Sequence, residues 1–177
     1  MGGDFAKLFE HIGDYLKNSD AVFGNIEGPV TAKGPNVGSR FSFAMDAKIL
    51  PVLVANNFKM VSFANNHVGD RSTTGFLDTI NNFDAAGLAY TGAGKNFIEA
   101  STVKIVTVND IKIGFIACSD VGPDWLKATE TAAGQLLCSN PKLSEIITPA
   151  KSQVDFLVFS AHWGAEYQPS SQHQIDI

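Results

Sequence analysis

The sequence has little charge, few cysteines and no long apolar segment, and each absence excludes a class of protein. Charged residues make up 18% of the chain, below the roughly 25% typical of globular domains. No Lys/Arg cluster occurs that could contact nucleic-acid phosphates, so nucleic-acid binding is not expected. No apolar stretch is long enough to span a membrane. Cys118 and Cys138 form no Cys-x-x-Cys pair, which excludes a zinc ribbon but leaves open a disulfide or two buried thiols.

The remaining composition indicates a domain with a large core. Hydrophobic residues make up 45% of the 177 residues, and 13 of these are Phe. We therefore expect residues 1–177 to form a single domain whose sheet is covered on both faces. The net charge is −5, so the chain repels acidic polymers unless a bound cation or a local basic patch intervenes.

Three apolar runs each end at polar side chains, and this is the most informative pattern in the chain. The runs are AVFGNIEG (21–28), MVSFANNH (60–67) and FLVFSAHWGAE (156–166). Each is typical of a buried strand. In open α/β sheets, ligands bind beyond the carboxyl ends of the strands. Neighbouring strands would therefore gather five side chains at one crevice: Asn25, Glu27, Asn66, His67 and His162.

The rest of the chain favours a mixed α/β fold. Helices alternate with strands as far as residue 91, which predicts a largely parallel sheet, and Asn109-Asp110 then predicts a hairpin that adds an antiparallel pair. We expect the first helix to be capped by Asp4, the second to be capped by Asp46 and interrupted at Pro51, and the third to stop at Gly87. The expected helices cover residues 5–16, 47–57, 72–86 and 141–151, and the expected strands cover 20–24, 59–64, 88–91, 102–108, 111–117 and 155–161.

Each polar strand end has a chemical interpretation and a structural one. Asn66 followed by His67 suits an amide metal ligand beside a general acid, or else a strand cap and turn. His162 suits a metal ligand whose ring Glu166 orients, or else a rim histidine packed beside Trp163.

The first strand end and the turn after His67 are less specific. Asn25 and Glu27 share one side of an extended strand and could complete an oxygen-rich site, although a loop cap is the simpler interpretation. Either Asp70 or Arg71 could line the pocket, and Arg71 could hold a phosphate or carboxylate, but the two are more simply interpreted as a solvated loop pair.

Four motifs in order resemble one family. They are NIEGP (25–29), SFANNH (62–67), GAG with a nearby EA (92–100) and HWGAEY (162–167). The chain is similar to the bacterial capsule-synthesis family, CapA or PGA_cap, which is associated with poly-γ-glutamate biosynthesis. That family resembles the calcineurin-like metallophosphoesterases, which implies an αββα sandwich with mixed sheets and a metal site at the strand ends.

The resemblance implies a role for each motif residue. His67 would be the catalytic acid, and Glu27, Asn66 and His162 would bind divalent metal ions such as Mn, Fe or Zn. Asn25, Asn65, Arg71 and Glu166 would line the pocket or support these residues. Two metal ions would together hold the attacking and leaving oxygens.

The sequence also departs from the metallophosphoesterase pattern. Gly24-Asn25 stands where that family has Gly-Asp, so the bridging aspartate is absent and Glu27 would have to replace it. We expect the domain to be truncated at both ends, without an earlier Gly-Asp strand and a later Gly-His-His motif. The remaining residues would then hold one ion or none, and the unpaired sheet edges would favour a homo-oligomer.

Two functions follow from the resemblance. The first is a metal-dependent phosphoesterase-like hydrolase that acts on a surface polymer or its precursor in capsule or poly-γ-glutamate biosynthesis. The second is a non-catalytic assembly or tethering component of a membrane-bound synthesis or export complex. Both imply an extracytoplasmic or cell-envelope location. A serine-nucleophile hydrolase is not indicated, because no Gly-x-Ser-x-Gly segment occurs.

Overall fold

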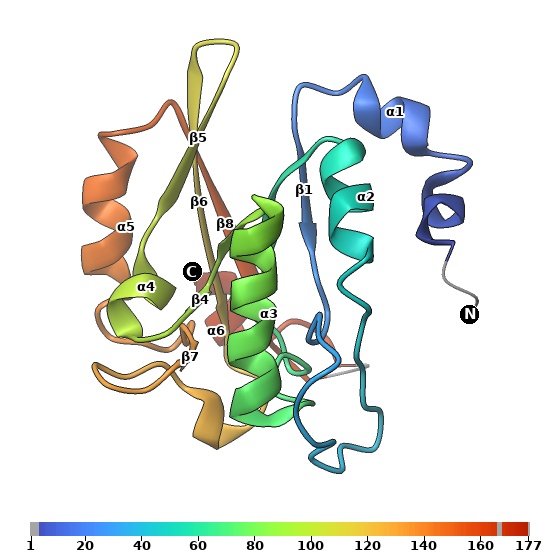
Figure 1. Cartoon of the computed structure of the whole chain (residues 1–177). Helices are drawn as coiled ribbons and strands as arrows, with labels where there is room; N and C mark the ends of the chain where they lie inside the picture. Colours follow the sequence, from blue (N-terminus) through green and yellow to red (C-terminus); the bar gives the residue numbers. More distant parts are fainter. Residues whose placement is uncertain (1–3, 166–167, 177) are drawn as a thin grey trace.

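The structure is a computed structural model that describes residues 4–165 and 168–176. Two three-stranded sheets lie face to face between helices (Figure 1). The expected α/β sandwich with mixed sheets is confirmed. None of the helices in these described ranges has the length and apolarity needed to cross a membrane.

The first sheet is fully parallel in the order β1-β2-β3, as the alternation of elements predicts. Its strands are β1 Val22–Asn25, β2 Phe58–Ser62 and β3 Ala89–Thr91. Helices α2 (Ile49–Ala55) and α3 (Ser72–Ala86) connect these strands. The main core lies here, and its largest fully buried side chains include Leu50, Val61, Phe63, Phe76, Ile80 and Phe83.

The second sheet has the order β5-β6-β8, with one antiparallel and one parallel pair. Its strands are β5 Lys104–Val108, β6 Ile111–Ser119 and β8 Phe156–His162. The β5–β6 hairpin turns at Asn109 and Asp110, whose φ angles of 50° and 67° match the expected Asn-Asp turn. Helices α4 (Phe97–Ser101) and α5 (Leu143–Lys151) contribute to a second core, and a short ribbon pairs β4 (Ala93–Gly94) with β7 (Gly134–Gln135).

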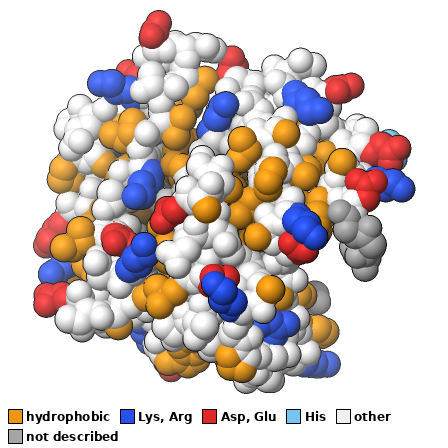
Figure 2. All heavy atoms as spheres, in the orientation of Figure 1, with side chains coloured by type: hydrophobic (Ala, Val, Ile, Leu, Met, Phe, Trp, Pro, Cys, Tyr) orange, Lys and Arg blue, Asp and Glu red, His pale blue; other side chains and the backbone are white. Residues whose placement is uncertain are grey.

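The two sheets meet through aromatic and polar contacts. The Phe23 ring of β1 stacks on the Phe115 ring of β6 with centroids 5.1 Å apart. The Thr91 hydroxyl of β3 donates to the Phe115 carbonyl at 3.3 Å. On the face shown in Figure 2, basic and acidic side chains are interspersed among hydrophobic ones.

The N-terminal segment differs from the single amphipathic helix expected over residues 5–16. A 3₁₀ helix, η1 (Phe5–Phe9), is followed by a separate short helix, α1 (Gly13–Lys17). Phe5 and Phe9 pack against the main core, but Leu8 and Ile12 are exposed. The apolar spacing therefore does not mark one buried face. Asp4 also makes no side-chain cap hydrogen bond.

The other helix boundaries follow local chemistry. Pro51 does not interrupt α2, because it lies in the first helical turn, where an N–H has no intrahelical partner. Asp46 accepts from the Lys48 N–H at 2.9 Å and so shapes the turn before α2 rather than capping the helix. Gly87 ends α3 in the left-handed conformation with φ of 66°, as expected. Two further short helices are η2 (Asp124–Leu126) and α6 (Gln172–Asp176).

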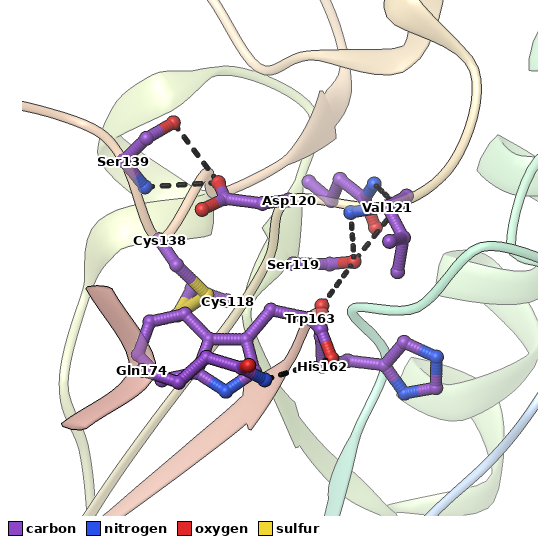
Figure 3. Close-up of a disulfide and its surroundings, with 10 residues drawn as sticks. Cys118, Ser119, Asp120, Val121, Cys138, Ser139, His162, Trp163 and Gln174 are labelled. Atoms are coloured by element: carbon purple, nitrogen blue, oxygen red, sulfur yellow. Dashed lines mark hydrogen bonds between the residues drawn. A yellow bond between two sulfur atoms is a disulfide. The ribbon is translucent and has the colours of Figure 1, made fainter. Parts of the chain in front are cut away.

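Cys118 and Cys138 form a disulfide, which resolves the alternative left open by the sequence. It joins the end of β6 to the segment that precedes α5, next to Ser119 and Trp163 (Figure 3). Both half-cystines are buried, and the bond closes a loop across a sequence separation of 20.

Replacing both cysteines by Ala should lower the free energy of unfolding by about 3 kcal/mol, because the disulfide restricts the unfolded chain. Urea denaturation of the oxidised protein and of the Cys118→Ala/Cys138→Ala variant measures this difference. A reductant should lower the free energy of unfolding of the parent protein and leave that of the variant unchanged. Equal urea midpoints for the two proteins would contradict the prediction.

The start of the long loop after β1 is fastened to α3. The Asp78 carboxylate of α3 accepts from Lys33 Nζ at 2.6 Å and also from the Thr31 hydroxyl. The Asn82 amide donates to the Val30 carbonyl at 2.8 Å, and Thr79 Oγ1 accepts from the Val30 N–H at 2.9 Å. The hydrogen bond from Lys33, followed by that from Thr31, lowers the pKa of Asp78 below its usual 3.8.

Asp78→Asn should lower the free energy of unfolding by about 1 kcal/mol at neutral pH, because an amide attracts Lys33 less strongly. The folded-state pKa of Asp78 lies below the unfolded one, so its contribution is complete above 3.8 and is lost as the pH falls through the folded-state value. The difference between parent and variant, measured by urea denaturation, should therefore shrink in acid. A difference that is independent of pH would rule out this ionic contribution.

Candidate active site

The carboxyl end of β1 is tied to the turn after β2 by one buried amide. Asn65 donates to Asn25 Oδ1 at 3.1 Å and to the Ile26 carbonyl at 2.8 Å. Its own side-chain oxygen accepts from the His67 N–H at 3.1 Å. Asn65 therefore positions the turn that carries His67, and it is fully buried in doing so.

The His67 ring is oriented by Asp70, three residues later in the same turn. Nδ1 of His67 lies 2.8 Å from Asp70 Oδ2. A carboxylate only accepts hydrogen bonds, so Nδ1 carries the proton of this pair and Nε2 is left for other chemistry. The Phe43 ring packs against the imidazole with centroids 4.2 Å apart.

His162 lies at the end of β8 and reaches the same place from the second sheet. Its Nε2 is 2.9 Å from Asn66 Oδ1. Its carbonyl accepts from Ser119 Oγ at 3.0 Å and from the Asp120 N–H at 3.2 Å, which fastens the end of β8 to the end of β6 (Figure 3).

Burial lowers the pKa of His162 below its usual 6.5. The nearby His67 lowers the pKa of His162 further, and Glu27 opposes both effects by raising it. The neutral imidazole, which is the form that binds metals, is therefore favoured at this position. Glu27 and His67 both act on His162, which indicates that the three side chains share one electrostatic environment.

Glu27 is the acidic member of this group. Its Oε1 lies 4.0 Å from His67 Nε2, and its Oε2 accepts from the Asn25 amide at 3.4 Å. Both Asn25 and Glu27 are exposed, while Ile26 between them is buried. The alternation expected for a strand end is therefore present here.

Of the eight sequence-predicted residues, direct contacts join four in one set and two in another, and the two sets are linked along the chain at Asn65-Asn66-His67. They are Asn25, Glu27, Asn65 and His67 in the first set, and Asn66 and His162 in the second. Arg71 lies beside the group, where its Nη1 donates to Ser42 Oγ at 2.9 Å and to the Asp70 carbonyl at 3.4 Å. Glu166 lies outside the described residues.

The donor atoms are of the kinds that a divalent ion accepts, namely imidazole nitrogen, amide oxygen and carboxylate oxygen. His162 Nε2 and Asn66 Oδ1 face each other at 2.9 Å, and Glu27 is near enough to raise the pKa of His162. Within the described ranges, however, no three His, Cys, Asp or Glu residues are grouped closely enough to hold a metal ion.

Asp70 is the residue that sequence reasoning misjudged. Its side chain is 2% exposed, so the interpretation as a solvated loop residue is wrong. One oxygen accepts from the Phe43 N–H at 2.8 Å and lies beside His67, while the other accepts from Ser39 Oγ at 2.9 Å. The His-x-x-Asp spacing within a turn could have identified it, whereas nothing in the sequence near Phe43 indicates its contact with His67.

Asp70→Ala should lower the free energy of unfolding by about 2–3 kcal/mol, because the Phe43 N–H loses its acceptor and the His67 and Ser39 contacts are lost. Asp70→Asn keeps acceptor oxygen and should cost about 1 kcal/mol. Asp84→Ala, which removes an exposed carboxylate from α3, is the matched control and should change stability by less than about 0.5 kcal/mol. Urea denaturation measures all three, and equal losses in Asp70→Ala and Asp84→Ala would contradict the assignment.

Comparison with known proteins places these residues in a family context. Residues 2–177 match the family described as bacterial capsule synthesis protein PGA_cap. The chain is 30% identical to a capsule biosynthesis protein CapA of Bacillus anthracis over 94% of its length. It is 28% identical to a PGA biosynthesis protein CapA of Bacillus subtilis (strain 168) over 90% of its length.

A more distant relative is a probable polyglutamine synthesis accessory protein of Mycobacterium tuberculosis, which is 26% identical over 84% of the chain. The chain spans 43% of the length of each Bacillus relative and 42% of the mycobacterial one.

Proposed function

The chain belongs to the bacterial capsule synthesis protein PGA_cap family, and from this premise we propose that it carries a metal-assisted hydrolytic site. The site would act in the production or export of poly-γ-glutamate or a related surface polymer. Its reaction would be attack of water on a phosphoester or amide-like bond of the polymer or its precursor.

The observation that carries this proposal is the pairing of an oriented histidine with a set of potential metal ligands. His67 is held by Asp70 through Nδ1, and its Nε2 faces Glu27 at 4.0 Å. Asn66, the residue before it, reaches His162 from the other sheet. The candidate proton donor and the candidate metal ligands thus lie next to each other along the chain, which supports a site for hydrolysis of an oxygen ester.

His67 would deliver to the leaving oxygen a proton carried on Nε2, while Nδ1 keeps the proton that it donates to Asp70. The bond from Nδ1 to Asp70 prevents the ring from rotating, so that Nε2 remains directed at the substrate. The Phe43 ring, packed on the imidazole, would exclude water from one face of it. Asn65 would hold the turn in register with β1 while the proton is transferred.

Glu27, Asn66 and His162 would hold one divalent ion, namely Mn, Fe or Zn. Bound there, the ion would act as a Lewis acid that polarises the substrate and activates water. The lowered pKa of His162 favours the neutral imidazole that such binding needs.

The proposed location is extracytoplasmic or at the cell envelope, in contact with a membrane-bound synthesis complex. The names of the relatives, which refer to capsule, PGA and polyglutamine synthesis, support an accessory role of this kind. The Cys118–Cys138 disulfide is an independent argument, because such bonds persist mainly in oxidising compartments.

A second candidate function is a non-catalytic assembly or tethering component. It is favoured by the scarcity of charged ligands, since the described residues contain no cluster of three His, Cys, Asp or Glu able to hold a metal. Asn25 also contributes a neutral amide at the end of β1. A site with one weakly held ion or none would serve assembly as well as catalysis.

Metal content and hydrolysis distinguish the two functions. After incubation with Mn²⁺, Fe²⁺ or Zn²⁺ and dialysis, the purified chain should retain about one ion, and His162→Ala should retain none because it lacks the imidazole ligand. His67→Ala should keep its ion but hydrolyse a dialkyl phosphodiester, whose leaving alkoxide needs a proton, about 100-fold more slowly, because it lacks the proton donor. Elemental analysis and steady-state rates are the measurements.

His11→Ala is the matched control, because His11 is exposed on the N-terminal segment. It should leave both metal content and rate unchanged. A parent protein that retains no ion and has no activity above the His67→Ala background would support the assembly function and reject the hydrolase. Equal activity in the parent and both site variants would remove these histidines from the reaction.

A further inference from the structure

The loop after β1 runs alongside the candidate active site. We call residues 31–45 the rim loop. Its first residues are held to α3 through Asp78, and its last residue returns to the segment after β1 by a hydrogen bond from the Met45 N–H to the Pro29 carbonyl at 2.9 Å. In Figure 1 the loop lies at the bottom, at the carboxyl end of β1.

The middle of the rim loop is attached to the residues that follow His67. Ser39 Oγ and the Phe43 N–H each donate to a different oxygen of Asp70. The Val37 N–H donates to the Asp70 carbonyl at 3.2 Å, and Ser42 Oγ accepts from Arg71. Because Asp70 also binds His67, the loop has a fixed position next to the imidazole.

The rim loop differs in charge from the rest of the chain. The whole chain has a net charge of −5, but residues 31–45 contain Lys33 and Arg40 and no Asp or Glu. Lys33 is paired with Asp78. Arg40 is exposed, its guanidinium lies 5.4 Å from the Phe41 ring centroid, and no carboxylate of the described residues is within ion-pair distance. A cation is therefore available beside the site.

The same loop exposes large apolar side chains. Phe41 is 63% exposed and Phe43 is 41% exposed. Phe43 carries its ring toward His67, and Phe41 carries its ring under the Arg40 guanidinium. Exposed aromatic rings beside an unpaired cation are typical of a surface that binds a partner with both charge and apolar area.

We propose that the rim loop binds an acidic polyamide chain, with Arg40 pairing with its carboxylates and Phe41 and Phe43 packing against its methylene groups. A γ-linked glutamyl chain has this chemistry, since each unit carries one carboxylate and two methylenes. This deepens the proposed function and depends on it for the choice of polymer. It also supplies the local basic patch that an acidic protein needs to approach an acidic polymer.

The position of the rim loop sets the path that a bound polymer follows toward the candidate active site. A polymer that lies across Arg40 and Phe41 and continues over Phe43 reaches His67, because the Phe43 and His67 rings are in contact. The rim loop would thus lead successive units of one chain to the imidazole. Apolar contact with the rings distinguishes an acidic polyamide from polyphosphate, which offers charge without apolar surface.

The proposal is tested by the binding of fluorescein-labelled poly-γ-glutamate, measured by fluorescence anisotropy in a buffer that contains a metal chelator. This measurement requires neither a bound metal nor hydrolysis. Arg40→Glu/Phe41→Ala should bind about tenfold more weakly than the parent, because it loses the charge contact of Arg40 and the packing contact of Phe41. Arg40→Lys keeps the charge and should bind more tightly than the double variant. The affinity of the parent should fall as salt is raised.

The matched control is Lys17→Glu/Tyr15→Ala, which makes the same charge change and removes an aromatic ring that is 81% exposed on α1, away from the rim loop (Figure 1). It should bind like the parent. Equal affinity of the parent and Arg40→Glu/Phe41→Ala would overturn the proposal. Polyphosphate of equal length binding as tightly as poly-γ-glutamate would also overturn it, because the rings would then contribute nothing. Failure of the hydrolase proposal alone would leave this binding intact.

Discussion

The buried carboxylate of Asp70 is the interaction on which the candidate site depends. It orients His67, accepts a backbone N–H from Phe43 and a hydroxyl from Ser39, and is almost completely shielded from water. A buried carboxylate is costly unless its oxygens are bonded, and here three donors share that role. The turn, the imidazole and the rim loop are consequently stabilised together, because no one of them satisfies the charge by itself.

The sandwich explains why residues from distant parts of the chain meet at this carboxylate. Parallel pairing of β1 with β2 places their carboxyl ends at one edge of the first sheet. In the second sheet, His162 at the end of β8 pairs with Ser119 at the end of β6. Contact between the sheets through Phe23 and Phe115 holds the two edges in register. Asn66 and His162, which are 96 positions apart in the sequence, can therefore form a direct hydrogen bond.

The sequence predicted the parts of this arrangement that depend on local patterns. Strand ends, the Asn109-Asp110 hairpin and the Gly87 stop all follow from short-range backbone chemistry, and the structure contains each of them. The helix expected over residues 5–16 was wrong because apolar spacing does not reveal whether a face has a partner to pack against. Asp70 was misjudged because its burial is created by the rim loop, whose fold the local sequence does not specify.

The rim loop and His67 both contact the Asp70 carboxylate. Binding along the rim loop would restrain Phe43, whose N–H and ring contact Asp70 and His67 respectively. A polymer held there would therefore limit motion of the His67 ring, while loss of the loop contacts would leave the buried Asp70 carboxylate undercompensated. Polymer binding on the rim loop, as proposed, and orientation of His67 would thus both depend on the Asp70 carboxylate.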